Sequence, residues 1–218
     1  DSTIDKSGNN SDSGSKIDSK TVVTALNTTN VTLSASETIT VNTPIDSSTN
    51  PNSHNLTFAT PTLTLNAPIT LAPGGSLSGT STTVNVNSGG IIQNGIDVVT
   101  PGGEVNLGAG TYLLEETITI NKSLTLTGES ATDTLISGND QVRGITITGS
   151  QTVVNIESLT VTQGSALDGG GIFVGAGNTL NLNNTILTQN TATGNTKLSG
   201  GGGIFNEGIV NLTNSTLF

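Results

Sequence analysis

Repetition at a nearly constant interval is the feature that most restricts how this chain can fold. The segment ETITVNTPID (37–46) returns 24 residues later as PTLTLNAPIT (61–70). Related segments follow at TTVNVNSGGII (82–92) and GGEVNLGAGTY (102–112), each about 21 residues further on. Periods of ~20–30 residues that each contain several short alternating segments are typical of a solenoid.

The second half of the chain contains three short alternating segments in each period, so its strands can be counted. They are TITI (117–120), LTLT (124–127) and TLIS (134–137), then ITIT (145–148), VVNI (153–156) and LTVT (159–162), then GIFV (171–174), TLNL (179–182) and TILT (185–188), and finally GIFN (203–206), IVNL (209–212) and STLF (215–218). In each segment Ile, Leu or Val alternates with Thr or Asn, which places the aliphatic side chains inside and the polar ones outside.

These observations predict an all-β fold, a right-handed three-sided parallel β-helix of about eight or nine turns over residues 21–218. A β-sandwich is the alternative, but it predicts no constant period. Residues 91–99 interrupt the rhythm. Ile91, Ile92, Ile96 and Val99 could line one face of a helix, whereas Gly95 weakens a helix, so helix and strand both stay open there.

The sequence also suggests how the chain is divided. Residues 1–20 are Ser, Asp, Asn, Gly and Lys with almost nothing to bury, which predicts a disordered arm or linker. Residues 21–100 carry the first kind of repeat, and residues 101–218 carry glycine-rich repeats that stop within a turn. The truncated last turn indicates a segment of a longer rod, or an uncapped end that allows end-to-end self-association.

Charge and composition exclude several classes of function. Lys and Arg total 6 against 16 Asp and Glu, a formal net charge of -10, which disfavours nucleic acid as a partner. Cys is absent, so no disulfide framework or thiolate metal site exists. No apolar stretch reaches the ~18 residues of a membrane span, so membrane insertion is not expected. We expect an extracellular or cell-surface location with export of the Gram-negative type.

Three resemblances to known families follow from quoted stretches. NVTLSASETITVNTPID and NLTFATPTLTLNAPIT resemble the repeats of filamentous-haemagglutinin-like bacterial exoproteins. The stretch 92–128 resembles the opening of right-handed β-helix proteins of the pectate-lyase-like superfamily. The third resemblance is to polymorphic-outer-membrane-type surface proteins, and it is carried by GGGIFVGAGNTLNLNNTIL (169–187) and its partial copy GGGIFNEGIVNLTNSTLF (201–218). The Phe-x-x-Asn tetrapeptide of that family is missing. Together these resemblances imply a β-helical surface adhesin.

The pectate-lyase resemblance makes an enzyme the alternative, because lyases on that fold use clustered Asp residues for Ca²⁺ and a basic residue at the reacting carbon. The basic residues of the repeats are Arg143, Lys122 and Lys197. The acidic residues are scattered singly or as the neighbours Glu115 and Glu116; the others considered are Asp97, Glu104, Asp133, Asp140, Glu157 and Asp168. His54, the only histidine, lies in a loop-like stretch. We therefore predict no catalytic residue, no cofactor and no metal site; Asp140 and Asp168 are the nearest candidates for Ca²⁺.

Three further sets of residues recur from turn to turn. Phe173 and Phe205 are expected to stack, and if they do, replacement of Phe205 by Ala should cost about 3 kcal/mol or more by cavity formation. Asn184 and Asn214 are expected to stack at a corner. Thr117 and Thr119 are expected under Thr146 and Thr148, as a Thr ladder of the kind that orders water in ice-binding proteins, but the ladder ends after two turns.

The function expected from the sequence is that of a non-catalytic structural or adhesive rod. Its expected partners are glycans or proteins on host or neighbouring cell surfaces. The alternatives are a carbohydrate-active or carbohydrate-binding β-helix and a self-stacking fibre subunit.

Overall fold

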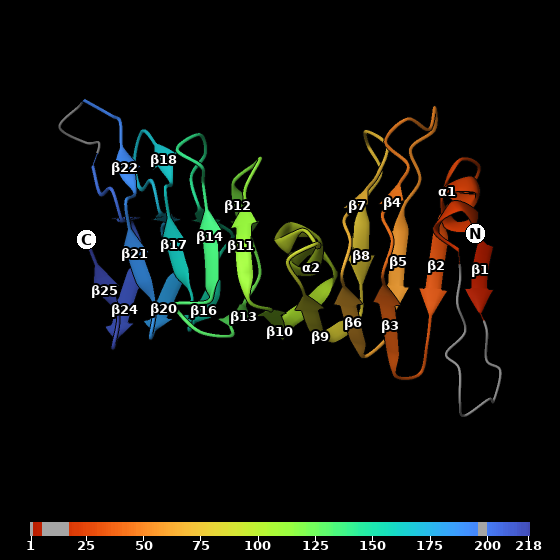
Figure 1. Ribbon diagram of the computed structural model, residues 1–218, viewed down its shortest axis with the longest axis horizontal. Helices are drawn as coiled ribbons and strands as arrows, with labels where there is room; N and C mark the ends of the chain where they lie inside the picture. The colour runs from red at the N-terminus through yellow and green to blue at the C-terminus, as the bar shows by residue number, and fades with distance from the viewer. Residues whose placement is uncertain (1, 6–17, 196–199) are drawn as a thin grey trace. The chain divides into compact units, whose positions relative to one another are not determined.

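A computed structural model describes residues 2–5, 18–195 and 200–218 (Figure 1). The chain forms two compact units, residues 1–100 and 101–218. Each unit is a parallel β-solenoid, because strands that follow one another by one period pair in parallel and in register. The boundary between the units coincides with the change in repeat type seen in the sequence.

The first unit contains three faces of parallel strands. One face has the order β1 (Ser2–Asp5), β2 (Val31–Ser34), β5 (Leu56–Ala59) and β8 (Leu77–Gly79). The second has β3 (Thr38–Val41), β6 (Thr62–Leu65) and β9 (Ser81–Val86). The third has β4 (Ile45–Asp46) and β7 (Ile69–Thr70). Inward residues stack between turns, as Leu63 does on Val84 and Leu65 on Val86, and all four are fully buried.

Two helices complete the first unit. Helix α1 (Ser19–Leu26) is capped by Asp18, whose side chain accepts a hydrogen bond from the Lys20 amide. Its buried residues are Val22 and Leu26, and it packs beside β2 and β4. Helix α1 therefore presents an apolar face to the turns and a polar face to solvent, as a capping element of a solenoid does.

Helix α2 (Ile92–Val98) decides the question that the sequence left open at residues 91–99. Ile92, Ile96 and Val98 are buried, so the helical spacing of the apolar residues outweighs the cost of Gly95 within the helix. The Asn94 side chain is also buried and accepts a hydrogen bond from the Ile69 amide at 3.0 Å. Helix α2 packs against β8 and β9 and takes the place of the third strand of that turn.

The second unit has three longer faces and one short accessory pair. The first face contains β10 (Val99–Leu107), β13 (Leu124–Gly128), β16 (Val153–Glu157), β20 (Thr179–Asn183) and β24 (Ile209–Thr213). The second contains β11 (Gly110–Leu113), β14 (Thr134–Ser137), β17 (Thr160–Thr162), β21 (Ile186–Thr188) and β25 (Thr216–Leu217). The third contains β12 (Ile118–Ile120), β15 (Ile145–Ile147), β19 (Ile172–Val174) and β23 (Ile204–Asn206); the accessory pair is β18 (Ser165–Ala166) with β22 (Thr191–Ala192).

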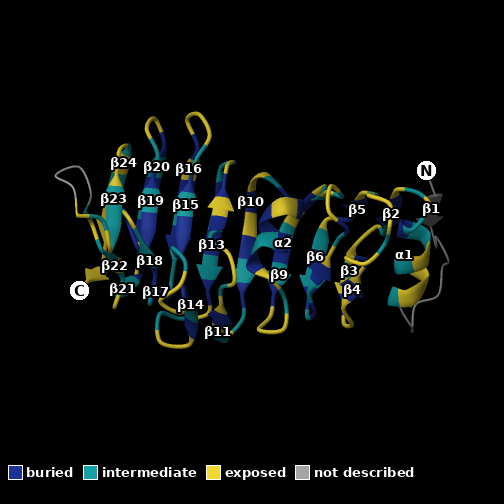
Figure 2. Ribbon diagram, turned by 90° about the horizontal axis from the view of Figure 1, so that it is seen from above, coloured by how far each residue is buried: buried dark blue, intermediate teal, exposed yellow. Residues whose placement is uncertain are grey.

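The core of each unit is aliphatic and lies along the inner sides of the strands. Exposed residues gather in the turns and on outward strand positions (Figure 2). In the second unit Leu126, Ile156, Leu180 and Leu182 are almost completely buried. Since equivalent residues stack on one another, the core fills without aromatic bulk.

The predicted fold class is confirmed, and each of the twelve strands expected in the second half is present within a residue or two of its expected position. The number of turns was overestimated. About six turns of the described chain have a strand on all three faces, rather than about eight or nine. The difference arises because α2 replaces one strand and because the β24–β25 turn contains two strands.

The expected disordered arm, residues 1–20, lies mostly outside the described residues. Of that segment, Ser2–Asp5 form β1, which pairs in parallel with β2, and α1 begins at Ser19. These two stretches of the segment therefore have regular secondary structure.

Candidate functional site

The candidate site lies on the outer side of the β12–β15–β19–β23 face. Pairing in this sheet aligns four outward residues of successive turns, Thr119, Thr146, Phe173 and Phe205. Arg143 precedes β15 and reaches toward the next turn. We call Arg143, Thr146, Asp168, Phe173 and Phe205 the Arg143 strip.

The Arg143 guanidinium joins two turns of the solenoid. Its Nη1 donates to the Thr146 hydroxyl at 3.0 Å, within its own turn. Its Nε and Nη2 donate to the carbonyls of Gly169 at 2.9 Å and Asp168 at 2.7 Å, both in the following turn. These charge-assisted bonds hold the glycine-rich corner before β19 in place.

The two aromatic rings of the strip are stacked, as the sequence predicted. The ring centroids of Phe173 and Phe205 are 5.9 Å apart and the ring planes differ by 8°. The Arg143 guanidinium carbon lies 5.2 Å from the Phe173 centroid, within range of a cation–π contact. Both phenylalanines are half-buried on the outer side of their strands, because Ile172 and Val174 occupy the inward positions. The rings therefore stack without filling the core, so loss of the Phe205 ring leaves no core cavity of the kind on which the expected cost of about 3 kcal/mol or more depended.

The electrostatics of the strip come from one cation and one carboxylate. Burial lowers the pKa of the Arg143 guanidinium, and the nearby Asp168 carboxylate acts in the opposite direction. Asp168 Oδ1 is buried and has no hydrogen-bond partner in the described part of the chain. Because this oxygen is buried, it is not accessible to a ligand on the outer side of the face.

The other candidate residues do not come together. Among residues 2–5, 18–195 and 200–218, no three His, Asp or Glu side chains are grouped so that they could hold a metal ion. Glu115 and Glu116 lie in the bend between β11 and β12 rather than on a strand. Asp97 accepts a hydrogen bond from Gln93 on α2.

The remaining acidic and basic candidates occupy separate turns and strands. Glu104 is on β10 and Glu157 is on β16, while Asp133 accepts a hydrogen bond from the Ser130 hydroxyl. Asp140 is exposed in a turn, His54 is in a loop and Lys122 precedes β13. Lys197 lies outside the described residues.

The expected Thr ladder on this face is shorter than predicted. The register pairs Thr119 with Thr146 but places Thr117 opposite Gly144, so the predicted double ladder was misaligned by two residues. Asn184 and Asn214 occupy equivalent corners, as expected, because they follow the paired strands β20 and β24 and share left-handed φ values of 51° and 50°. The Asn184 side-chain amide, however, donates to the Ser158 hydroxyl of the preceding turn at 3.3 Å. Asn tolerates this region better than most residues, which explains its use there.

Sequence reasoning missed two features of the outer surface. One is a pair of hydrogen-bonded Asn ladders, in which each side-chain amide donates to the Asn of the preceding turn. They are Asn42–Asn66–Asn87 in the first unit and Asn155–Asn181–Asn211 in the second. The match of Asn42 with Asn66 in the repeats was the signal that could have revealed the first ladder.

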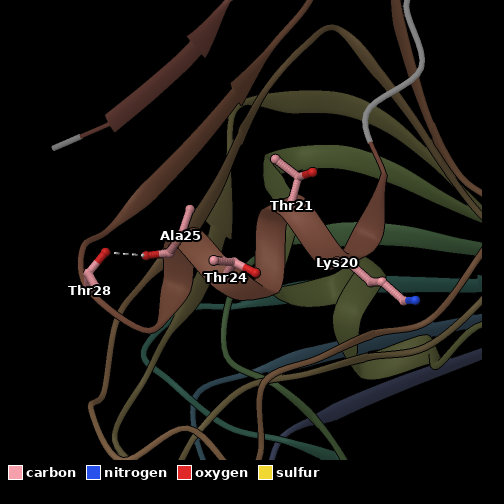
Figure 3. A pocket seen from close by; sticks show the side chains of 5 residues that line it. All are labelled: Lys20, Thr21, Thr24, Ala25 and Thr28. Carbon is pink, nitrogen blue, oxygen red and sulfur yellow. Dashed lines mark hydrogen bonds between the residues drawn. The ribbon is translucent and has the colours of Figure 1, made fainter.

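The other missed feature is a hollow of about 440 Å³ on the outer side of α1. Its lining consists of Lys20, Thr21, Thr24, Ala25 and Thr28 (Figure 3). The Thr28 hydroxyl is already used, because it donates to the Ala25 carbonyl at 3.2 Å. The hollow therefore reflects the polar outer face of the capping helix.

Comparison with protein-family models, with curated proteins and with solved structures finds no match to this chain. The β-helical part of the resemblance noted in the sequence is confirmed by the fold, and the family identity stays a prediction. The two helices of the described chain, α1 and α2, are too short and insufficiently apolar to cross a membrane.

Proposed function

We propose that this chain is a non-catalytic structural and adhesive segment of a secreted or surface-displayed bacterial exoprotein. The observation that carries the proposal is the in-register alignment of outward side chains along parallel ladders, fixed in both units by hydrogen-bonded Asn columns. Such columns present the same chemical group at regular intervals on a stiff support. A stiff, repetitive surface suits contact with another surface, because little conformational entropy is lost on binding.

Charge narrows the class of partner. With a net charge of -10, the chain is repelled by anionic lipid and by sulfated or phosphorylated polymers. Neutral glycans and proteins of a host or neighbouring cell surface are therefore the proposed partners.

The direct test is binding of the purified chain to a glycan array and to fixed cells, with the unfolded chain as control. Saturable binding that requires the folded chain is the expected result. Polygalacturonate and related polymers are incubated with the same preparation in parallel. Cleavage of any of them would overturn the non-catalytic proposal, and absence of binding to every surface would overturn the adhesive one.

A carbohydrate-binding role is the second candidate, and the Arg143 strip favours it. Half-exposed aromatic rings can contact the apolar faces of sugars, and Phe173 and Phe205 form a stacked pair of this kind. Phe205→Ala, which removes one ring of the stacked pair, should then weaken glycan binding while Asp133→Asn does not. Equal binding by both variants would leave the strip with a structural role only.

A further inference from the structure

A second outward surface, in the first unit, has a regularity that the adhesive proposal does not use. Strands β3, β6 and β9 lie side by side (Figure 1) and align three outward residues in each of three turns. We call these nine residues the lattice face: Thr38, Thr40 and Asn42, then Thr62, Thr64 and Asn66, then Thr83, Asn85 and Asn87. Every one is exposed or half-buried.

The spacing of this face follows from β geometry. Equivalent residues of neighbouring turns are ~4.8 Å apart, and outward residues along one strand are ~6.6–6.8 Å apart. Five Thr and four Asn therefore form a three-by-three array of polar groups that repeats in two directions. A polymer chain repeats in one direction, whereas a crystal surface repeats in two.

The array is also held rigid. Asn66 donates its amide to Asn42 Oδ1 and Asn87 donates to Asn66 Oδ1, each at 2.6 Å. Asn85 donates to the Thr64 hydroxyl at 3.4 Å. Thr is restricted at χ1 by its branched Cβ, so the hydroxyl and methyl groups need little further ordering to meet a fixed lattice.

The chemistry of the lattice face is neutral throughout. None of its nine positions holds an acidic, basic or aromatic residue, although the chain as a whole carries a net charge of -10. A neutral face does not compete for ions or attract charged polymers, and without an aromatic platform it lacks the stacking contact that sugar rings use. What it offers is a fixed array of hydroxyl, amide and methyl groups that can hold water in an ordered layer.

We propose that the lattice face binds the surface of ice. The Thr hydroxyls and Asn amides order a layer of water that merges with the crystal, and the methyl groups set the gaps between them. Binding of this kind restrains crystal growth next to the protein. The inference is independent of the adhesive function and concerns a different unit from the Arg143 strip.

The second unit supplies an internal contrast. Its corresponding outward columns on β10, β13, β16, β20 and β24 contain Glu104 and Glu157 among Thr and Asn. Carboxylates keep their own hydration shell, which does not fit the uniform water layer of the lattice face. Thr127 on β13, which pairs with Glu157, is therefore a matched position at which the same substitution should have no effect.

The experiment freezes the purified chain slowly around a cold surface and measures the protein in the ice and in the remaining liquid. A second assay follows recrystallisation of fine-grained ice by microscopy. The wild-type chain should be enriched in ice relative to an ice-inert globular protein of similar mass, and it should slow recrystallisation. Thr64→Lys, at the centre of the array, should lose both effects, whereas Thr127→Lys should retain them.

Circular dichroism and the urea midpoint establish that each variant is folded. If Thr64→Lys does not fold, Thr40→Lys replaces it, because Thr40 is exposed at the edge of the array. Absence of wild-type enrichment would overturn the proposal, as would equal loss in the lattice variant and in Thr127→Lys. Binding to microcrystalline cellulose without enrichment in ice would also overturn it, by assigning the face to a neutral polysaccharide.

Discussion

Phe58 should be the aromatic residue whose loss costs the most stability. Its side chain is completely buried, and in the sheet it lies between Leu33 and Gly79 of the neighbouring turns. Gly79 has no side chain and is closely approached by Val98, so little is available to refill the space left by Phe58→Ala. Burial of ~150–250 Å² at ~25 cal/mol per Å² corresponds to ~4–6 kcal/mol for the whole ring. With Cβ retained and a cavity added, we expect a loss of about 3–5 kcal/mol.

Urea unfolding followed by far-ultraviolet circular dichroism measures the loss, with Phe205→Ala as the matched comparison. Phe205 is half-buried on the outside, where its stacking on Phe173 is worth ~0.5–1.5 kcal/mol beyond the area it buries. Phe205→Ala should therefore lower the urea midpoint of unfolding much less than Phe58→Ala does. A Phe58→Ala loss equal to or smaller than the Phe205→Ala loss would refute the assignment of inner and outer positions.

Three further predictions test individual polar groups. Ser81 is fully buried and its hydroxyl has no hydrogen-bond partner in the described chain, so Ser81→Ala should stabilise the fold by about 1 kcal/mol in urea unfolding. Ser137→Ala is the control: it loses two hydrogen bonds and should destabilise the fold. Ser158 has a φ of 53° at the corner that Asn occupies in later turns, so Ser158→Asn should raise the thermal midpoint by recovering part of the ~1–2 kcal/mol cost of this conformation. Burial raises the pKa of Tyr112 to about 12, above its unfolded value of ~10. The contribution of the neutral Tyr112 side chain to the free energy of unfolding is therefore complete below pH ~10 and is lost as the pH rises toward 12. Unfolding measured against pH should show this loss in the wild-type chain but not in Tyr112→Phe.

Most of the fold could be predicted from sequence because the same alternation recurs in every turn. A segment such as TLNL (179–182) is too short to be assigned as a strand by itself. Its repeated copies indicate both that it is a strand and which strands of the neighbouring turns it pairs with. The helices were harder to predict because each occurs once. The short α1 depends on two buried residues, Val22 and Leu26, and its first residues lie in a stretch whose composition indicates disorder.

The candidate site was predicted less well because pairing of recurring residues does not say which side of the strand they occupy. Phe173 and Phe205 were correctly expected to stack, yet alternation with Ile172 and Val174 already placed them outside. Arg143 could not be connected with Asp168 from sequence, because the contact depends on the path of the corner before β19. An irregular corner has no periodic pattern from which its geometry can be inferred.

The unit of function on such a surface is the column rather than the residue. A β-helix repeats each outward position at every turn, so one substitution interrupts a row of identical groups and the hydrogen bonds along it. On the lattice face of the first unit the columns are neutral Thr and Asn, whereas columns of the second unit carry Glu104, Glu157 and the aromatic pair. The two proposed activities should therefore be separable: Thr64→Lys should leave glycan binding intact, and Phe205→Ala should leave ice enrichment intact. If each substitution abolished both activities, the columns would not be acting as independent surfaces.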